Sequence, residues 1–352
     1  MSRFRRLLVS CAALLASSSG SLDLHGVMPH GLDGRRALVT GASGFIGTRL
    51  SEALVAAGAE VHAVARTAGD SHDVRWWTAD LSDPDAASRV MRETAPEVVF
   101  HVAGHVTGAQ GLDVVVPSLR GNLLATVNVL AAAAGQGSVP RVVLAGSMQE
   151  PGSDVREGDA AAVPVSPYAA TKSAATGYAR MFHALYDLPV VVLRVFMVYG
   201  PGPQNQDKVI PYTIRSLMAG EPPRLSSGTR AVDWVYIDDV VSAFLAAADH
   251  RAALALGRTI DIGSGDLTTI RSVAERLAGL VGHDVVPQFG AEPDRPLERE
   301  SRAADLGPAR ELLGWVPETT LDDGLARTVA WFRDPQHPHA RADAMPPARL
   351  RG

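Results

Sequence analysis

Tyr168 and Lys172 are the two side chains whose types and spacing point most directly to chemistry. Residues four apart share one face of a helix and lie one turn from each other. A phenol with its ordinary pKa of about 10 is a poor acid–base catalyst at neutral pH, but a neighbouring ammonium favours the phenolate and lowers that pKa. Only two of the 33 basic residues are lysines, so a Tyr–Lys pair at this spacing is hard to produce by chance. The pair predicts a tyrosine that exchanges a proton with a substrate.

Ser147 is a hydroxyl that could act on the same substrate. It follows the apolar run Arg141–Ala145 and precedes Tyr168 by 21 residues. If the run is a strand, Ser147 lies at the sheet edge where sites form, and its hydroxyl could hydrogen-bond the oxygen that Tyr168 protonates.

Glycines recur every three residues in the segment TGASGFIG, at Gly41, Gly44 and Gly47. The segment joins a predicted strand to a predicted helix. A side chain at either of the first two glycines would keep the backbone away from a pyrophosphate, and Gly47 would let the helix pack on the strand. The helix N-terminus adds N–H donors and a positive dipole end. This context predicts a dinucleotide-binding loop.

The elements that must position these residues alternate along the chain. Strands are predicted at Arg36–Thr40, Glu60–Ala65, Val74–Thr78, Glu97–Val102, Arg141–Ala145 and Val190–Val195. Helices are predicted at Phe45–Ala57, Asp83–Glu93, Leu119–Ala134, Tyr168–Tyr186, Asp239–Ala247 and Ile270–Val281. Apolar strands separated by helices indicate βαβ units. The expected fold is α/β: a Rossmann-type doubly wound parallel sheet with a smaller C-terminal substrate-binding segment over the carboxyl ends of the strands.

Four parts of the chain are expected. Residues 34–198 form the NAD(P)-binding domain, and residues 199–334 form mainly the substrate-binding segment. Residues 335–352, rich in Pro, Arg and His, are expected to be a disordered tail. Residues 1–33 are an extension that resembles a secretory signal, but its apolar run is too short to span a bilayer. We therefore interpret this segment as an unstructured extension, or as the result of a start codon assigned too early, with Met28 as the natural first residue.

Composition excludes several functions. With 46% hydrophobic and 20% charged residues, the chain is of an ordinary globular type. A net charge of −5 argues against a nucleic-acid partner bound by phosphate neutralisation. Cys11 is the single cysteine, so neither an intrachain disulfide nor a cysteine-based metal cluster can form, which fits a cytoplasmic protein. No metal and no membrane association are expected.

Several motifs together resemble one family. TGASGFIG, the set Ser147, Tyr168 and Lys172, LRVFMVYGPGP, VDWVYIDDV and LGWVPETTLDDGL occur in the order seen in the extended short-chain dehydrogenases/reductases. More narrowly, the chain resembles the nucleotide-sugar epimerases, dehydratases and ketoreductases, from about Gly34 to Asp334. The resemblance implies NAD or NADP, a nucleoside-diphosphate hexose and a homodimer. It also implies Ser147 as hydroxyl partner, Tyr168 as acid–base, and Lys172 as its activator and ribose ligand.

The site residues that follow are of two kinds. Those expected to contact the cofactor are Gly41, Ser43, Gly44, Phe45, Ile46, Gly47, Arg66, Asp80, Leu81, Ala103, Tyr168 and Lys172. On the substrate side, Met197 stands where the family usually has Asn, and Val232 where it has Arg. Arg230 or Arg295 could supply the diphosphate clamp instead. Asp238 and Asp239 are expected only to cap the helix that follows them.

Two departures from the family pattern narrow the reaction. The 4,6-dehydratases carry Thr-Asp-Glu where this chain has Ser147, Met148 and Gln149, and neither of the last two can transfer a proton. Glu150 could serve only if the register slipped by one residue. At the end of the second strand, Arg66 follows Ala65 where NAD-preferring members have an acid, which suits the 2′-phosphate of NADP(H), with NAD(H) still open.

The expected activity is therefore reduction of an NDP-4-keto-6-deoxyhexose by a cytoplasmic 4-ketoreductase. An NDP-hexose 4-epimerase is the close alternative. A 4,6-dehydratase, or a non-catalytic NADP-binding sensor or scaffold, is less favoured, because the complete Ser/Tyr/Lys set has no use in a sensor.

Overall fold

The computed structural model describes most of the chain, and the ranges described are residues 31–150, 163–282, 284–294 and 302–335. The predicted extension, 1–33, and the predicted tail, 335–352, lie almost wholly outside these residues. Arg295 lies outside them too.

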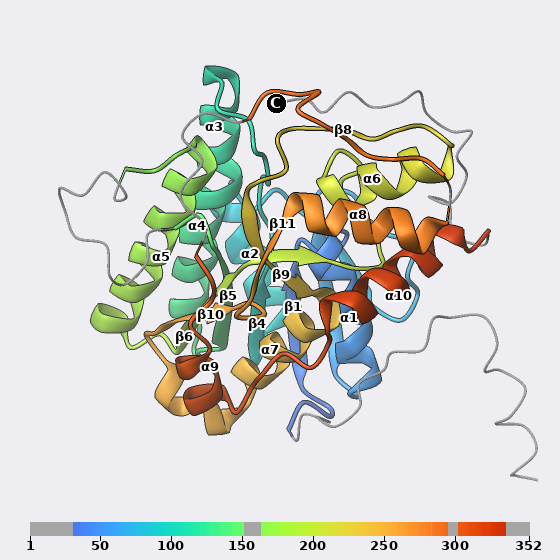
Figure 1. Ribbon diagram of the computed structural model, residues 1–352. Helices are drawn as coiled ribbons and strands as arrows, with labels where there is room; N and C mark the ends of the chain where they lie inside the picture. The colour runs from blue at the N-terminus through green and yellow to red at the C-terminus, as the bar shows by residue number, and fades with distance from the viewer. Residues whose placement is uncertain (1–30, 151–162, 283, 295–301, 336–352) are drawn as a thin grey trace, which may run out of the picture.

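Seven strands form the central sheet, and all neighbouring pairs are parallel (Figure 1). In spatial order they are β10 (Thr259–Ile262), β6 (Val190–Val195), β5 (Arg141–Ser147), β4 (Val98–His101), β1 (Arg36–Thr40), β2 (Glu60–Ala65) and β3 (Arg75–Thr78). The strand order reverses between β1 and β4, and helices cover both faces, so the predicted doubly wound sheet is confirmed.

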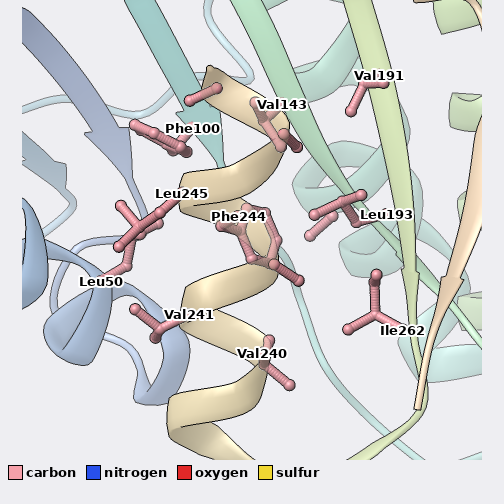
Figure 2. Close-up of a cluster of buried hydrophobic side chains, with 14 of the residues drawn as sticks. Leu50, Phe100, Val143, Val191, Leu193, Val240, Val241, Phe244, Leu245 and Ile262 are labelled. Carbon is pink, nitrogen blue, oxygen red and sulfur yellow. The ribbon is translucent and has the colours of Figure 1, made fainter. Parts of the chain in front are cut away.

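One face of the sheet is covered by α2 (Pro84–Thr94), α4 (Ala125–Ala134) and α5 (Pro167–Tyr186). The other is covered by α1 (Phe45–Ala56), α7 (Ile237–Ala248) and α9 (Leu306–Leu313). Figure 2 shows Phe244 and Leu245 of α7 packed between Leu50 of α1 and the strand residues Leu193 and Ile262. Strands buried on both faces explain why their sequences are apolar runs without alternation.

The smaller segment stacks its own helices beside the sheet (Figure 1). It contains α6 (Val209–Met218), α8 (Ile270–Val281), α10 (Leu321–Arg333), the sheet β11 (Leu267–Thr269)–β9 (Ala231–Tyr236)–β7 (Met197–Tyr199), and the pair β12 (Gln288–Phe289)–β8 (Arg224–Leu225). The same part of the chain also contributes β10 to the central sheet, and α7 and α9 to one of its faces. The predicted division after residue 198 runs through β7. Its residues therefore serve both layers.

Asp238 and Asp239 do not cap α7, so that prediction is wrong. The helix begins after Tyr236 without a side-chain cap. The Asp238 carboxylate instead accepts hydrogen bonds from Arg49 on α1, the shorter at 2.7 Å. Asp239 accepts the backbone N–H groups of Glu318 and Thr319, each at 3.1 Å. Both carboxylates tie separate parts of the chain together.

The predicted helix Leu119–Ala134 is longer and less regular than expected. It begins with a 3-10 turn (Leu112–Val114) and α3 (Val115–Ser118), and continues through a π-helical stretch (Leu119–Leu124) into α4. By length and composition, Leu112–Ala134 could cross a membrane. In the structure, however, α4 packs between α2 and α5 as part of the helical layer.

We expect Gly47→Ala to destabilise the fold. A Cβ at Gly47 would lie 2.8 Å from the Ala42 Cα and would also meet the Gly41 carbonyl, so α1 would have to move off the sheet. Overpacking of this kind should lower the free energy of unfolding by about 1–3 kcal/mol, measured by urea denaturation.

Gly279→Ala is the matched control, because a Cβ at this exposed position of α8 meets nothing within 4 Å outside its own helix. It should raise the free energy of unfolding by up to about 1 kcal/mol through helix propensity. Equal effects of the two substitutions would contradict this account of Gly47.

Candidate active site

Ser147, Tyr168 and Lys172 come together where β5 ends and α5 begins. Ser147 is the last residue of β5. Helix α5 starts with Pro167, and its N-cap Ser166 accepts the Ala169 N–H at 3.1 Å, which fixes the first turn that carries Tyr168. The Ser147 and Tyr168 side chains share a hydrogen bond. All three residues are buried.

The Tyr168 phenol is protonated over the whole neutral range. Burial raises the pKa of Tyr168 to about 12; the hydrogen bond with Ser147 lowers it, and the charge of Glu150 raises it. Burial thus opposes the depression expected from Lys172, which stays a prediction for the protein with a cationic nicotinamide bound. The sequence pattern identifies Tyr168 and Lys172 as neighbours, but it does not reveal how deeply the two side chains are buried.

The Lys172 ammonium lies beneath the tyrosine ring. Its Nζ is 6.0 Å from the ring centroid and donates a hydrogen bond to the Ala145 carbonyl at 2.9 Å. Burial lowers the pKa of Lys172, and the negative charge of Glu150 acts in the opposite direction.

Of the loop after β5, the structure describes residues 148–150 and 163–166, and none of these presents an acidic or basic side chain that could act in dehydration. Met148 packs against the core, and the Gln149 side-chain oxygen accepts a hydrogen bond from Ser166 at 3.2 Å. Glu150 is only 2% exposed, and its two oxygens accept hydrogen bonds from the Ser147 N–H and the Thr176 hydroxyl. A shifted register therefore does not present Glu150 to a substrate.

Asn122 is a site residue that the sequence analysis missed. Its carboxamide accepts the His105 N–H at 2.7 Å and donates to the Thr171 hydroxyl of α5 at 3.1 Å. A Cβ at Gly104 would lie 2.9 Å from the Asn122 Oδ1, so this glycine lets the carboxamide approach the chain after β4. The Lys172 Nζ, at 3.7 Å, would be at an ordinary contact distance. Asn122 stands in a run that also holds Arg120 and Asn128, so the sequence carried no distinct signal for it.

The glycine loop fits a dinucleotide pyrophosphate. Gly41 has φ of +70°, and a Cβ there would come within 2.7 Å of the Ala103 Cα at the end of β4. Gly44 is the N-cap of α1 and makes no side-chain cap, so the first N–H groups of α1 face outward. Ser43 is exposed, while Phe45 and Ile46 are half-buried at the start of the helix.

The adenosine end of the expected groove carries more cations than the sequence analysis assigned. Arg66 is exposed directly after β2. A hydrogen bond from the Ser82 N–H, at 2.9 Å, is the main cause that lowers the pKa of Asp80, and the charges of Arg120 and Arg66 add to it. Arg120, from the π-helical stretch, therefore joins Arg66 near Asp80. The Leu81 side chain packs in the core on the α2–α4 face instead of at this surface.

The candidate substrate residues lie in the smaller segment. Met197 is half-buried in β7, opposite Trp234 of β9. Arg230 is half-buried directly before β9, and its carbonyl accepts the Ile270 N–H at 3.0 Å. Lys208, the second lysine, is the N-cap residue of α6, and burial lowers its pKa.

Comparison with known proteins agrees with this geometry. Residues 37–263 match the model of the NAD dependent epimerase/dehydratase family. The chain is 32% identical to the UDP-glucose 4-epimerase of Mycolicibacterium smegmatis over 85% of this chain and 99% of that protein. It is 29% identical to a dTDP-glucose 4,6-dehydratase of Mycobacterium tuberculosis, over 85% and 93%.

A solved structure extends the likeness to the fold. The UDP-glucose 4-epimerase of Thermus thermophilus, in complex with NAD, is 29% identical and superposes with a TM-score of 0.72, covering 85% of this chain and 99% of that one. Because the family model spans all seven strands of the central sheet together with Ser147, Tyr168 and Lys172, the chain belongs to the NAD dependent epimerase/dehydratase family.

Proposed function

We propose that this protein is an NADPH-dependent 4-ketoreductase that acts on a nucleoside-diphosphate 4-keto-6-deoxyhexose. The observation that carries the proposal is geometric: the Tyr168 phenol is buried, shares a hydrogen bond with Ser147 and lies over the Lys172 ammonium, so it is placed to donate a proton. Reduction of a ketone consumes one proton, so a protonated tyrosine is the form that this reaction needs first.

The residues divide the work as follows. A bound nicotinamide supplies the hydride. Tyr168 gives its proton to the oxygen of the former carbonyl, and Ser147 hydrogen-bonds the same oxygen as negative charge develops on it. Lys172, held by the Ala145 carbonyl, contributes the positive charge beneath Tyr168 and is the expected ligand of the nicotinamide ribose.

NADP(H) is the proposed cofactor. Arg66 and Arg120 supply positive charge near the end of β2, where a 2′-phosphate would lie, and Ala65 provides no carboxylate to bind two free ribose hydroxyls. Arg230 and Arg295 remain the proposed diphosphate ligands, with Lys208 as a third cation of the same segment.

A 4-epimerase is the second candidate, because the comparisons favour it. Two of the relatives described above are UDP-glucose 4-epimerases, and one of them is in complex with NAD. An epimerase must first remove a proton from a hydroxyl, which requires the Tyr168 phenolate. A bound oxidised nicotinamide is cationic and would lower the Tyr168 pKa. The two reactions therefore begin with different cofactor charges: epimerisation with the cationic oxidised form, and reduction with the neutral reduced form.

We also propose a cytoplasmic homodimer. Apolar side chains lie exposed on adjacent helices: Val115 and Val116 of α3 are 40% and 58% exposed, and Leu185 of α5 is 67% exposed. A second copy of this chain, presenting the same two helices, is the partner that would cover them.

Tyr168→Phe should lower turnover by about 10²–10⁴ while cofactor binding and folding persist, because only the exchangeable proton is lost. Steady-state kinetics and a cofactor titration measure the two effects. Tyr178→Phe is the matched control, since this tyrosine is 43% exposed on the same helix, and its turnover should match that of the wild type. Near-full activity of Tyr168→Phe would refute the mechanism.

NADP(H) should bind the apoprotein more tightly than NAD(H). Arg66→Ala should weaken NADP(H) binding by roughly 10-fold or more and leave NAD(H) binding nearly unchanged, because a charged hydrogen bond is lost only with the 2′-phosphate. Calorimetric titration measures both affinities, with Arg92→Ala on α2 as a control arginine away from this end. Tighter NAD(H) binding would contradict the proposal.

The experiment that tests the reaction itself is incubation with sugar nucleotides. A 4-keto-6-deoxyhexose nucleotide and NADPH should give a 4-hydroxy product and oxidised cofactor. UDP-, TDP-, GDP- and CDP-hexoses should not lose water, because Met148 and Gln149 cannot transfer protons. Mass spectrometry and cofactor absorbance follow both outcomes. Epimerisation without net consumption of NADPH would select the second candidate, and a 4-keto-6-deoxy product would refute the exclusion of dehydration.

A further inference from the structure

Glu150 is a buried carboxylate in the wall of the active site that the mechanism above does not use. It is 2% exposed, three residues after Ser147, and both of its oxygens accept hydrogen bonds. The Oε1 lies 2.6 Å from the Ser147 backbone N, and the Oε2 lies 2.7 Å from the Thr176 hydroxyl oxygen. Burial raises the pKa of Glu150, whereas the hydrogen bonds from Thr176 and Ser147 and the charges of Arg194 and Lys172 lower it and favour the carboxylate.

These two bonds connect the end of β5 to α5, one turn beyond Lys172. Glu150 binds Ser147 through the Ser147 backbone N–H. Thr176 lies one turn after Lys172 on the same helix. Space for the carboxylate exists because residue 146 is glycine: a Cβ at Gly146 would lie 2.9 Å from the Glu150 Oε1. The Ser147 hydroxyl and the Tyr168–Lys172 helix are thus set relative to each other through Glu150.

The charges around this carboxylate are few. From β6 it is faced by Arg194, which already forms an ion pair of 2.9 Å with Asp261, and from α5 it is faced by Lys172. Lys172 is faced from β4 by His101, which is neutral because burial and the lysine charge lower its pKa to about 3. Among the described residues, Glu150 is the negative charge that acts on the Lys172 ammonium.

We propose that Glu150 is a positioning residue of the active site, whose carboxylate fixes Ser147 against α5 and acts as the counter-charge of the Lys172 ammonium. The proposal deepens the proposed function, since it rests on Tyr168 acting as the proton donor with Ser147 and Lys172 as its partners. A carboxylate that served only to stabilise the fold would affect the melting temperature but not the charge state of Lys172.

The decisive measurement uses the two lysines of the chain. In protein labelled with ¹³C at the lysine side chains, two ε-carbon signals are expected, and Lys208→Arg assigns them. Glu150→Gln keeps the shape of the side chain and removes its charge. A carboxylate favours the ammonium, so its loss should lower the Lys172 pKa by about 1 pH unit or more, while the Lys208 signal titrates as before.

A second pair of variants tests the hydrogen bond. Thr176→Val keeps the Glu150 charge and removes one donor, and should lower kcat roughly 3- to 10-fold with little change in KM for the cofactor. Thr176→Ser restores the hydroxyl and should recover most of that loss. Glu52→Gln, an exposed carboxylate of α1, is the control for both measurements.

The outcomes separate this inference from the proposed function. An unchanged Lys172 pKa in folded Glu150→Gln overturns the inference. Wild-type turnover in Thr176→Val also overturns it, and this second result is sufficient if Glu150→Gln does not fold. Failure of the wild type to act on any sugar nucleotide would refute the proposed function instead, and the lysine titration, which needs no substrate, would still test the role of Glu150.

Discussion

The burial of the Lys172 ammonium is the constraint on which the rest of the active site depends. A charge removed from water is tolerated only where hydrogen bonds and an opposite charge replace its hydration. The Ala145 carbonyl, in β5, accepts a hydrogen bond from the ammonium, and the negative charge of Glu150, three residues after that strand, acts on it. The strand that carries Ser147 therefore also supplies a hydrogen-bond acceptor to the cation, which links the positions of the three candidate side chains.

The same principle explains how the second half of the chain is held over the sheet. Asp233 of β9 is fully buried and accepts three backbone N–H groups, from Ser264, Gly265 and Ala304, together with the Ser264 hydroxyl. These donors come from the turn after β10 and from the chain leading to α9. The hydrogen-bonded Asp233 carboxylate thus joins the smaller segment to the edge of the central sheet. A buried carboxylate without these hydrogen bonds would strongly destabilise the fold.

Sequence periodicity was sufficient to predict most strands and helices of the central sheet layer, but it did not predict which side chains would contact each other. Three of the six predicted strands and the helix Ile270–Val281 match the structure residue for residue, because apolar runs and their Gly and Pro boundaries are local signals. Strand β10 was missed, and its partner, β6, is far away in the chain. Glu150, Asn122 and the carboxylates of Asp238 and Asp239 depend on residues that approach only after folding.

The depth of Tyr168 links the geometry to the direction of the reaction. Burial favours the neutral phenol, and the hydrogen bond with Ser147 only partly opposes it. A cationic oxidised nicotinamide would be the charge that tips the phenol towards phenolate, whereas a neutral reduced one would leave it protonated. In the proposed reduction, the proton on Tyr168 would therefore depend on the redox state of the cofactor. A site arranged in this way donates a proton when hydride is available and is ready to accept one only after the hydride has left.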